Sequence, residues 1–525
     1  MSDSAILEKG IYHEENEKAS SLRSYHTSSA SDDAESEEQT PLTRDSPLRR
    51  LTTATRDASH NFSNWLIEWT PFVLFISYYA ASTAIYCFCP EEYIKIFYFF
   101  FMVTNFYIAA TTVIEAFLGV SPVREARAAA TKAEKSGWKF PTPDEKLPII
   151  DLVIVAYLPN EQDIVKDQVM YALEELIYPK EKLRINLVYN TPKSIEPLET
   201  ELHSMQKLYP QLVVTKVPNS KSKADNLNHF FTLNTGADVI GIFDCDHFPH
   251  PHNPRWAAER FAKDASVDIV QGRCVVYNTN EGIIPKMVAL EFDKIYAVSH
   301  PGRSRLYGFG LFCGSNGYWK ADLLKGHKMH GSMLTEDIDS ALRAYGQGKN
   351  AVHDMNVISY EMAPVAWMAF WKQRMRWAQG WTQASIVHMP LIWTNPPDGR
   401  RGINERFGVF SLLLVREIAY YLVSQHTCLV LSFVITGWPH NPVDLVRLIF
   451  FRYPLAEWFL FSTVCCLFLT LYITDLVRSE FTTWRQMIVF SIIYVPYLIL
   501  MATMGLYGHA RQICKYSSWN PTARK

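Results

Sequence analysis

The sequence has little cysteine, almost no net charge and no apolar segment at its start. Its 9 cysteines include no CxxC pair, and Cys87, Cys89, Cys465 and Cys466 lie inside apolar runs. We therefore expect reduced, buried cysteines, and neither a disulfide framework nor a zinc ribbon. The formal net charge of −2 provides no basic field that would favour nucleic acid as a partner. Because the first residues are polar, we expect no cleavable signal peptide.

Apolar residues are concentrated in a few long stretches. Hydrophobic residues make up 48% of the chain, and both Pro71–Cys89 and Ile94–Leu118 are predominantly apolar. Each is long enough to cross a bilayer of roughly 30 Å as a helix. The positive-inside rule places the basic segment that follows, VREARAAATKAEKSGWK, in the cytosol. The sequence therefore predicts a transmembrane hairpin at residues 71–118 that anchors a cytosolic domain.

The N-terminal region, residues 1–60, is rich in Ser, Thr, Glu and Asp and almost free of large apolar residues. Such a segment cannot bury enough apolar surface to fold. We predict a disordered cytosolic tail. Asn61-Phe62-Ser63 matches a glycosylation sequon, which we interpret as a chance match because this side of the hairpin is cytosolic.

The C-terminal third is again apolar. The stretch Phe407–Trp438 is too long for one simple span, so we predict interfacial helices over 386–421 and transmembrane helices over 422–508. Further spans are expected at Leu455–Ile473 and Met487–Tyr507. Three spans would place the C-terminus outside, whereas the basic tail, residues 509–525, favours the cytosol. Either one span is miscounted or one helix is re-entrant.

Residues 148–385 have the pattern of a soluble α/β domain. The segments expected to form buried strands are IIDLVIVAYL, RINLVYN, QLVVTKV, ADVIGIFD and VDIVQGRCVVY. Helical patterns such as DIVKDQVMYALEELIY and IEPLETELHSMQKLY separate most of them. This alternation predicts a mostly parallel, doubly wound sheet with its ligands at the carboxyl ends of the strands.

Acidic and imidazole side chains follow the strand ADVIGIFD. Asp244 and Asp246 can share one hard cation, and His247 can supply a third ligand. Oxygen-rich ligation suits Mg²⁺ or Mn²⁺ bound together with a diphosphate. Zinc is disfavoured because the nearby His250 and His252 are separated by prolines and no cysteine stands at zinc-site spacing. Taken alone, an acidic turn without a metal is the commoner explanation.

Two other segments are suited to a ligand. Lys221 and Lys223 precede a predicted helix, where a cation and free backbone donors can bind phosphate; a solvated lysine pair is the alternative. The loop GLFCGSNGYW contains Gly308, Gly310 and two further glycines, Gly314 and Gly317. Such a loop either lets the backbone approach a ligand closely or forms a tight connection.

Two helices carry the remaining candidates. Thr335-Glu336-Asp337 opens an amphipathic helix. In one interpretation Thr335 is the N-cap and the two acids interact favourably with the helix dipole. In the other, Asp337 is a base that faces the cleft. Further on, WMAFWKQRMRWAQGWTQ places Gln373, Arg376 and Trp377 on one helix face. An arginine fork suits a diphosphate and an indole suits a sugar ring. The alternative interpretation, an aromatic-rich amphipathic helix that lies on the membrane, is compatible with these two binding roles.

Asp-x-Asp, Thr-Glu-Asp and Gln-x-x-Arg-Trp occur in this order between membrane helices. In this the chain resembles the family 2 glycosyltransferases of the polysaccharide-synthase type, which include cellulose, hyaluronan and chitin synthases. The motifs cover about residues 148–385, and VYNTP and VQGRCVVYN look most like the fungal branch. The resemblance implies an α/β GT-A domain flanked by transmembrane helices, a nucleotide-activated sugar, usually UDP-linked, and transfer with inversion.

The resemblance also implies roles for individual residues. Asp337 would deprotonate the acceptor hydroxyl and Arg376 would stabilise the departing diphosphate. Site residues implied by the family are, for catalysis, Asp337 and Glu336; for the nucleotide sugar, Tyr157, Glu161, Lys223, Asp244 and Arg376; for the acceptor, Gln373, Arg374 and Trp377; and for Mg²⁺ or Mn²⁺, Asp244, Asp246 and His247.

One feature departs from the family. In the enzymes of the family, the second strand normally ends in an Asp-Asp-Gly type turn that holds uracil. In this chain the corresponding strand ends Val188-Tyr189-Asn190-Thr191-Pro192. Asn190 can hydrogen-bond a base, but the preference for UDP is less secure without the carboxylate. The tail Trp519–Arg524 loosely resembles the W-x-x-T-x-R/K loop that closes over the donor.

Three functions follow from these patterns. The first is a processive synthase that builds a cell-surface or cell-wall polysaccharide and exports it through its own helices, which favours the plasma membrane. The second transfers a single sugar to a lipid acceptor, as ceramide glucosyltransferases do. The third is a catalytically silent membrane scaffold, suggested by the missing Asp-Asp turn. The expected partners are a UDP-sugar, a growing polysaccharide or lipid acceptor, and membrane lipid.

Overall fold

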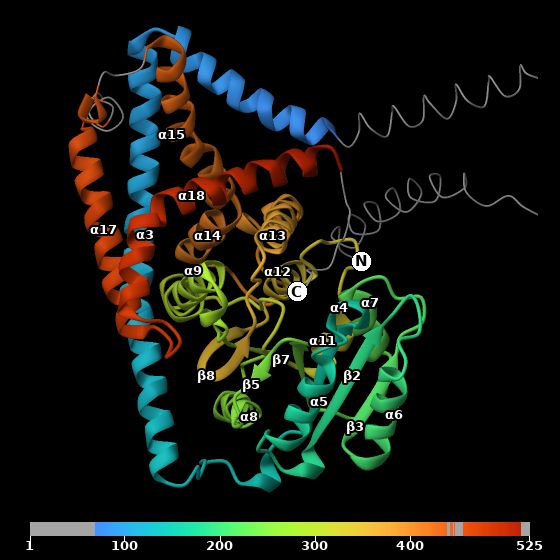
Figure 1. Cartoon of the computed structure of the whole chain (residues 1–525). Coiled ribbons are helices and arrows are strands. Elements are labelled where there is room, and N and C mark those ends of the chain that lie inside the picture. Colours follow the sequence, from blue (N-terminus) through green and yellow to red (C-terminus); the bar gives the residue numbers. More distant parts are fainter. Residues whose placement is uncertain (1–68, 438–440, 445, 447–454, 516–525) are drawn as a thin grey trace, which may run out of the picture. The chain divides into compact units, whose positions relative to one another are not determined.

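The computed structural model describes residues 69–437, 441–444, 446 and 455–515, all within one compact unit, residues 66–525. The predicted tail at 1–60, the sequon at Asn61 and the loop Trp519–Arg524 lie outside the described residues. Figure 1 shows an α/β domain beside a set of long helices.

An eight-stranded sheet forms the centre of the α/β domain, with the strand order β3-β2-β1-β4-β7-β6-β8-β5. The strands β1 to β4 pair in parallel, and β6 pairs in parallel with β8. β7 runs antiparallel to both β4 and β6, and β5 runs antiparallel to β8. The sheet is thus mixed: its first half and the β6–β8 pair have the predicted parallel arrangement, and β7 and β5 do not. The strands are β1 (Ile150–Tyr157), β2 (Leu183–Asn190), β3 (Leu212–Lys216), β4 (Val239–Asp244), β5 (Phe248–Pro249), β6 (Ile269–Val276), β7 (Gly317–Lys320) and β8 (Ala351–Glu361).

Helices cover both faces of the sheet and leave the strands buried. Nearly every residue of β1 and β2 is buried, which explains why these strands are continuous apolar runs without alternation. A separate buried cluster of apolar side chains packs on each side of the sheet. The helices of this domain are α4 (Leu158–Glu161), α5 (Val165–Glu174), α6 (Leu198–Leu208), α7 (Lys223–Phe231), α8 (Asn253–Lys263), α9 (Ile283–Phe292), the π-helical η4 (Asp293–Ser299), α10 (His300–Tyr307), α11 (Ala321–His327), α12 (Glu336–Gly346) and α13 (Trp367–His388).

Among the described residues, five helices are long enough and apolar enough to cross a membrane: Trp69–Phe88, Glu91–Lys135, Ile403–Thr436, Ala456–Val477 and Trp484–Ile513. The second of these is α3, which continues as helix into the predicted cytosolic basic segment and ends at Lys135. The third is continuous through α14 (Ile403–Phe410), η6 (Ser411–Val415) and α15 (Arg416–Thr436). The predicted junction between interfacial and transmembrane segments, at 421–422, therefore lies inside α15. The last two are α17 (Ala456–Val477) and α18 (Trp484–Ile513).

Both ends of α18 lie against the α/β domain. Just before the helix, Thr482 Oγ1 donates a 2.8 Å hydrogen bond to Asp293. Near its other end, a Cβ on Gly508 would lie 3.0 Å from the backbone nitrogen of Gln379 on α13. Pro496 lies inside α18, where a proline commonly kinks a helix, and α18 turns to run across α13 in Figure 1. Both ends of α18 therefore contact the same domain, which a simple span would not do.

Candidate active site

The predicted site residues gather around one cavity of about 510 Å³. The cavity begins at the carboxyl ends of β1, β2 and β4 and continues to side chains of α13, α15 and α18. The residues that the family resemblance assigns to catalysis, the nucleotide sugar, the acceptor and the metal all line it: Tyr157, Glu161, Lys223, Asp244, Asp246, His247, Glu336, Asp337, Gln373, Arg374, Arg376 and Trp377.

Lys223 joins three segments of this site. It is the first residue of α7, whose N-cap Ser222 accepts a hydrogen bond from the backbone of Asp225. Lys223 Nζ donates hydrogen bonds of 2.5 Å to Asp244 Oδ1 and 2.7 Å to the Gly314 carbonyl. Burial lowers the pKa of Lys223, but the carboxylates of Asp244 and Glu336 outweigh this and hold the pKa above its usual value. The ammonium therefore stays charged, as a phosphate ligand should.

Asp244, Asp246 and His247 form one donor group at the end of β4. One ligand atom from each lies within 4.8 Å of the others. Two carboxylates and one imidazole, beside a cavity that can hold a diphosphate, suit a divalent cation that keeps further positions for phosphate oxygens. The residues present thus fit Mn²⁺ or Mg²⁺.

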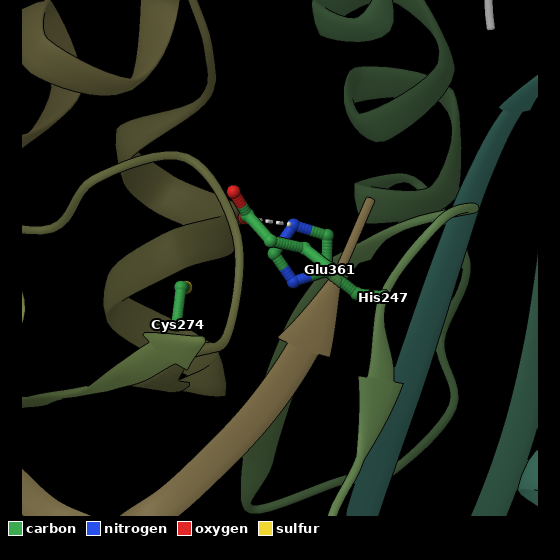
Figure 2. A group of neighbouring side chains, drawn as sticks. All are labelled: His247, Cys274 and Glu361. Atoms are coloured by element: carbon green, nitrogen blue, oxygen red, sulfur yellow. Dashed lines mark ion pairs between the residues drawn. The ribbon is translucent and has the colours of Figure 1, made fainter. Parts of the chain in front are cut away.

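His247 also lies close to two residues of β8. Its Nε2 lies 3.0 Å from Glu361 Oε2, and its Nδ1 lies 3.2 Å from Ser359 Oγ. His247, Glu361 and Cys274 form a second donor group, drawn in Figure 2. Burial lowers the pKa of His247, but the Glu361 carboxylate and Cys274 raise it well above its usual value. Glu361 was not predicted from the sequence, because β8, the strand that it ends, was not among the predicted strands.

His250 and His252 do not line the cavity, and their rings lie 5.9 Å apart, so the prolines do not separate them as expected. The His252 ring stacks on Trp138 with 3.8 Å between ring centroids, and His250 lies 5.9 Å from the same ring. Burial lowers the pKa of His252 to about 4. Both side chains therefore act as neutral packing groups.

Glu336 and Asp337 occupy the first turn of α12. Burial raises the pKa of both carboxyls, and Asp337 raises that of Glu336 further, while Lys223 and Arg376 act in the opposite direction. Thr335 holds the N-cap position without a side-chain capping bond, so that part of the capping explanation is wrong. The Thr335 side chain instead packs against α13, where a Cβ on Gly380 would lie 2.5 Å from its Cγ2.

The glycine-rich loop lets the backbone approach Asp337. Gly314 has a φ of +90°, and a Cβ there would lie 2.7 Å from Asp337 Oδ2. A side chain would therefore displace the carboxylate that the sequence predicts as the base. At Gly310 and Gly317 the close neighbours are protein atoms, the Ala351 carbonyl and the Phe312 ring, so these two glycines serve tight packing.

The helix α13 carries the Gln-x-x-Arg-Trp residues. Arg376 donates a 3.4 Å hydrogen bond to the Leu334 carbonyl, next to the start of α12. Gln373 Oε1 is buried without a hydrogen-bond partner among the described residues. Arg374 instead contacts the protein: it lies 2.6 Å from Glu291 and its guanidinium stacks 4.5 Å from the Trp377 ring centroid. Arg374 thus lies against Trp377, the aromatic candidate for acceptor binding, and also lines the cavity.

Amides occupy the end of the cavity next to β1 and β2. Asn190 accepts a 2.9 Å hydrogen bond from Asn226 and donates one of 3.1 Å to the Ser220 carbonyl. At the end of β1, Glu161 accepts a 2.8 Å hydrogen bond from the backbone of Tyr157. The Asn190 side chain is thus fixed at the position where the related enzymes are expected to have a carboxylate.

The chain is similar in sequence to several known glycosyltransferases. The chain is 26% identical over 240 residues to the probable glycosyltransferase YdaM of Bacillus subtilis, which covers 45% of this chain and 56% of the relative. It is 23% identical over 270 residues to the cellulose synthase catalytic subunit [UDP-forming] of Pseudomonas fluorescens, covering 50% of this chain and 34% of the relative. A probable glucomannan 4-beta-mannosyltransferase 7 of Oryza sativa is 24% identical over 240 residues, covering 44% and 40%. The chain thus spans about half or less of the length of these relatives.

Among solved structures, the mannosyltransferase PcManGT of Pyrobaculum calidifontis, in complex with GDP-Man and Mn²⁺, superposes with a TM-score of 0.46 at 15% identity, covering 78% of this chain and all of the other. The model of the glycosyl transferase family group 2 matches residues 239–506. This match extends over more than half of the 525 residues and includes the donor group, the first turn of α12 and the Gln-x-x-Arg-Trp helix. The chain belongs to the glycosyl transferase family group 2.

Proposed function

We propose that the protein is a membrane-embedded, inverting glycosyltransferase that transfers a hexose from a nucleotide sugar to a growing polysaccharide. The observation that carries this proposal is the gathering of every predicted site residue around one cavity that extends from the α/β domain to the membrane helices. The relatives named as cellulose synthase and glucomannan mannosyltransferase support a polysaccharide product. One of these names includes "UDP-forming", which supports a UDP-sugar as the donor.

The donor diphosphate would lie between α7 and the end of β4. Asp244, Asp246 and His247 would hold Mn²⁺ or Mg²⁺, which supplies positive charge for the diphosphate oxygens. Lys223 and Arg376 would bind the same diphosphate and stabilise the negative charge that develops as it leaves. Tyr157, Glu161 and the fixed amide of Asn190 would contact the nucleoside.

The acceptor would approach from the side of α13 and the membrane helices. Asp337 would take the proton of the acceptor hydroxyl as its oxygen forms a bond to the anomeric carbon. The bond between that carbon and the diphosphate oxygen breaks in the same step, and attack from the opposite side inverts the configuration. Glu336 would keep negative charge near Asp337, while Gln373 and Trp377 would hold the acceptor sugar. Arg374 would fix the Trp377 ring.

The proposed topology places the catalytic domain in the cytosol. The basic side chains at the end of α3 support this orientation. A polysaccharide exporter with this orientation belongs in the plasma membrane.

A lipid acceptor is the second candidate, favoured by one observation. At its membrane end the cavity is lined by Leu412, Met501 and Met504, which suit an acyl chain as well as a sugar. The two candidates differ in product length, because a synthase yields a ladder of polymers and a lipid transferase yields a single glycolipid.

The full chain in lipid nanodiscs tests the proposal. UDP-glucose, UDP-N-acetylglucosamine, UDP-glucuronate and GDP-mannose are supplied in turn, with Mn²⁺ or with EDTA, and nucleotide release is measured for the unaltered protein and for Asp337→Asn. We expect metal-dependent release with one donor, and almost none from the variant. Equal, negligible release from both proteins, in membranes where a known synthase works, would contradict an enzymatic function and favour the scaffold.

A further inference from the structure

Three segments far apart in the sequence bring the donor group of Figure 2 together. His247 lies in the turn between β4 and β5, Cys274 is on β6, and Glu361 ends β8. One ligand atom from each lies within 4.8 Å of the others. Cys274 and His247 are almost completely buried. The group shares only His247 with the donor group at Asp244 and Asp246.

The register of the sheet explains this arrangement. β6 and β8 pair in parallel with Cys274 opposite Ser359 and Val276 opposite Glu361. Side chains two residues apart on a strand point to the same face, so Cys274, Ser359 and Glu361 project from one face of the sheet. β5 joins the other edge of β8, with Phe248 opposite Tyr360, and this places the preceding residue, His247, over the same face.

The distances suit coordination of one metal ion. His247 Nε2 and Glu361 Oε2 are 3.0 Å apart, close to the separation of roughly 3.3 Å between two ligands of a tetrahedral zinc ion. The other ring nitrogen, Nδ1, lies 3.2 Å from Ser359 Oγ. A metal-ligating histidine usually has such an outer partner on its second nitrogen, which fixes the ring orientation.

We propose that His247, Cys274 and Glu361 form a binding site for zinc or a similar thiophilic divalent cation, separate from and exclusive with the site at Asp244 and Asp246. Nitrogen, sulfur and oxygen ligands are those that zinc takes, and a thiolate selects zinc over Mg²⁺ and Mn²⁺. On binding, the thiol of Cys274 forms the metal–sulfur bond and releases its proton to water. His247 and Glu361 line the cavity, so the fourth position faces the cavity and takes water or a small anion.

The shared histidine gives the site a consequence for catalysis. When Nε2 binds zinc beside Glu361, the other nitrogen, Nδ1, lies 3.2 Å from Ser359 Oγ, so neither nitrogen is available to the group at Asp244 and Asp246. If the proposed transferase function holds, zinc should inhibit transfer that Mn²⁺ or Mg²⁺ supports. This consequence rests on the proposed function, whereas the binding of zinc does not.

Cobalt tests the site without turnover. Purified full chain in nanodiscs, stripped with EDTA and kept anaerobic, is titrated with Co²⁺, whose bond to a thiolate produces a charge-transfer absorbance in the near ultraviolet. We expect the band to saturate at one Co²⁺ per chain, to be displaced by Zn²⁺, and to be absent in Cys274→Ser. The control is Cys313→Ser, which removes another thiol that lines the cavity, 3.9 Å from a histidine nitrogen, and should keep the band. No thiolate band, or a band that persists in Cys274→Ser, would refute the site.

A second variant tests the site independently, in case Cys274→Ser does not fold. Glu361→Gln retains the thiol and the size of the side chain but removes the carboxylate, so the band should remain while the Co²⁺ affinity falls at least about tenfold. Ser359→Ala should weaken binding by a similar factor through the histidine orientation. Both must match the unaltered protein in elution volume and melting temperature. Unchanged Co²⁺ affinity in Glu361→Gln would exclude Glu361 as a ligand and refute the site as proposed.

The inhibition is measured separately, at fixed Mn²⁺ and donor. Each protein is normalised to its own rate without zinc, and we expect the zinc concentration for half-inhibition to rise at least about tenfold in Cys274→Ser and not in Cys313→Ser. Equal zinc sensitivity in all three proteins would refute the link to catalysis. Absence of any transfer, with the cobalt band present, would contradict the proposed function and leave the metal site supported.

Discussion

The ammonium of Lys223 lies 2.5 Å from Asp244 Oδ1. This pair joins the start of α7 to the end of β4, and the same ammonium binds the Gly314 carbonyl of the glycine-rich loop. Three segments that the sequence singled out separately therefore meet at one nitrogen. A diphosphate that enters this place encounters a cation already oriented by its partners, which lowers the cost of arranging it on binding.

Lys223→Gln should reduce kcat/KM for the donor at least about tenfold, because a charged hydrogen bond to phosphate is lost. The effect should fall on kcat as well as on the donor KM, because Lys223 would bind the diphosphate and stabilise the charge that develops as it leaves. The matched control is Lys221→Gln, since Lys221 is exposed and lies only two residues away. A similar loss in both variants would show that the general positive charge of this loop matters and that the contact of Lys223 does not.

Asp337→Asn should lower kcat about 100-fold or more, with little change in donor binding, because the amide cannot accept the proton of the acceptor hydroxyl. Nucleotide binding by titration calorimetry and turnover by nucleotide release separate the two effects. Loss of donor binding together with kcat would contradict the role of Asp337 as the base.

Gly314→Ala should reduce kcat about tenfold or more. The new Cβ would lie 2.7 Å from Asp337 Oδ2, at a φ of +90° that alanine rarely adopts, so the carboxylate must move. Gly326→Ala is the control, because Gly326 lies in α11 and a Cβ added there would have no described atom within 4 Å. That change should be neutral or slightly stabilising. Equal activity of the two variants would contradict the close approach of the loop to the base.

The pH dependence of kcat/KM should reflect the raised pKa of the carboxyls at the start of α12. Burial raises the pKa of Asp337, and burial together with Asp337 raises that of Glu336. Because Asp337 must be ionised to accept a proton, activity should fall as the pH drops through this raised pKa, at a higher pH than for a free carboxyl group. In Glu336→Gln one negative charge is removed, so the acidic limb should shift to lower pH. A shift to higher pH would contradict the interaction.

Asp293→Asn should destabilise the fold by about 3 kcal/mol, because it leaves the buried Arg273 without its charged partner, 2.7 Å away. Asp293 also accepts hydrogen bonds from Ser479 and Thr482 in the loop before α18. The loss is measured as the midpoint temperature at which detergent-solubilised protein ceases to elute as a single species.

The control for that change is Asp475→Asn. Asp475 forms a similar ion pair with Arg478 at 2.8 Å, but both side chains are partly exposed, and such pairs contribute little. Comparable midpoint temperatures for the two variants would mean that burial of the Asp293 pair does not matter to stability.

The order of elements was predictable because their patterns are local. The predicted strands correspond to β1, β2, β3, β4 and β6, since runs of buried apolar residues are read directly from the chain. The α/β GT-A domain flanked by membrane helices is confirmed, together with family membership. The antiparallel β7 was not predicted, because its four residues carry no local signal for strand direction.

The membrane region shows the limit of local patterns more clearly. Hydropathy and length mark α18 as a span, yet contacts at both of its ends return it to the α/β domain. Hydropathy reports how apolar a segment is. It does not report where the ends of the segment lie, which only packing against distant elements decides.

The sequence by itself determined the family motifs, and with them which side chains line the cavity at Asp244, Lys223, Asp337 and Trp377. Tertiary structure alone decided their partners: Glu361 and Cys274 beside His247, and Glu291 beside Arg374. The reason is physical. A motif is a set of neighbours along the chain, whereas the charge, orientation and metal preference of a side chain depend on neighbours in space, which strand register and helix packing bring together from distant positions.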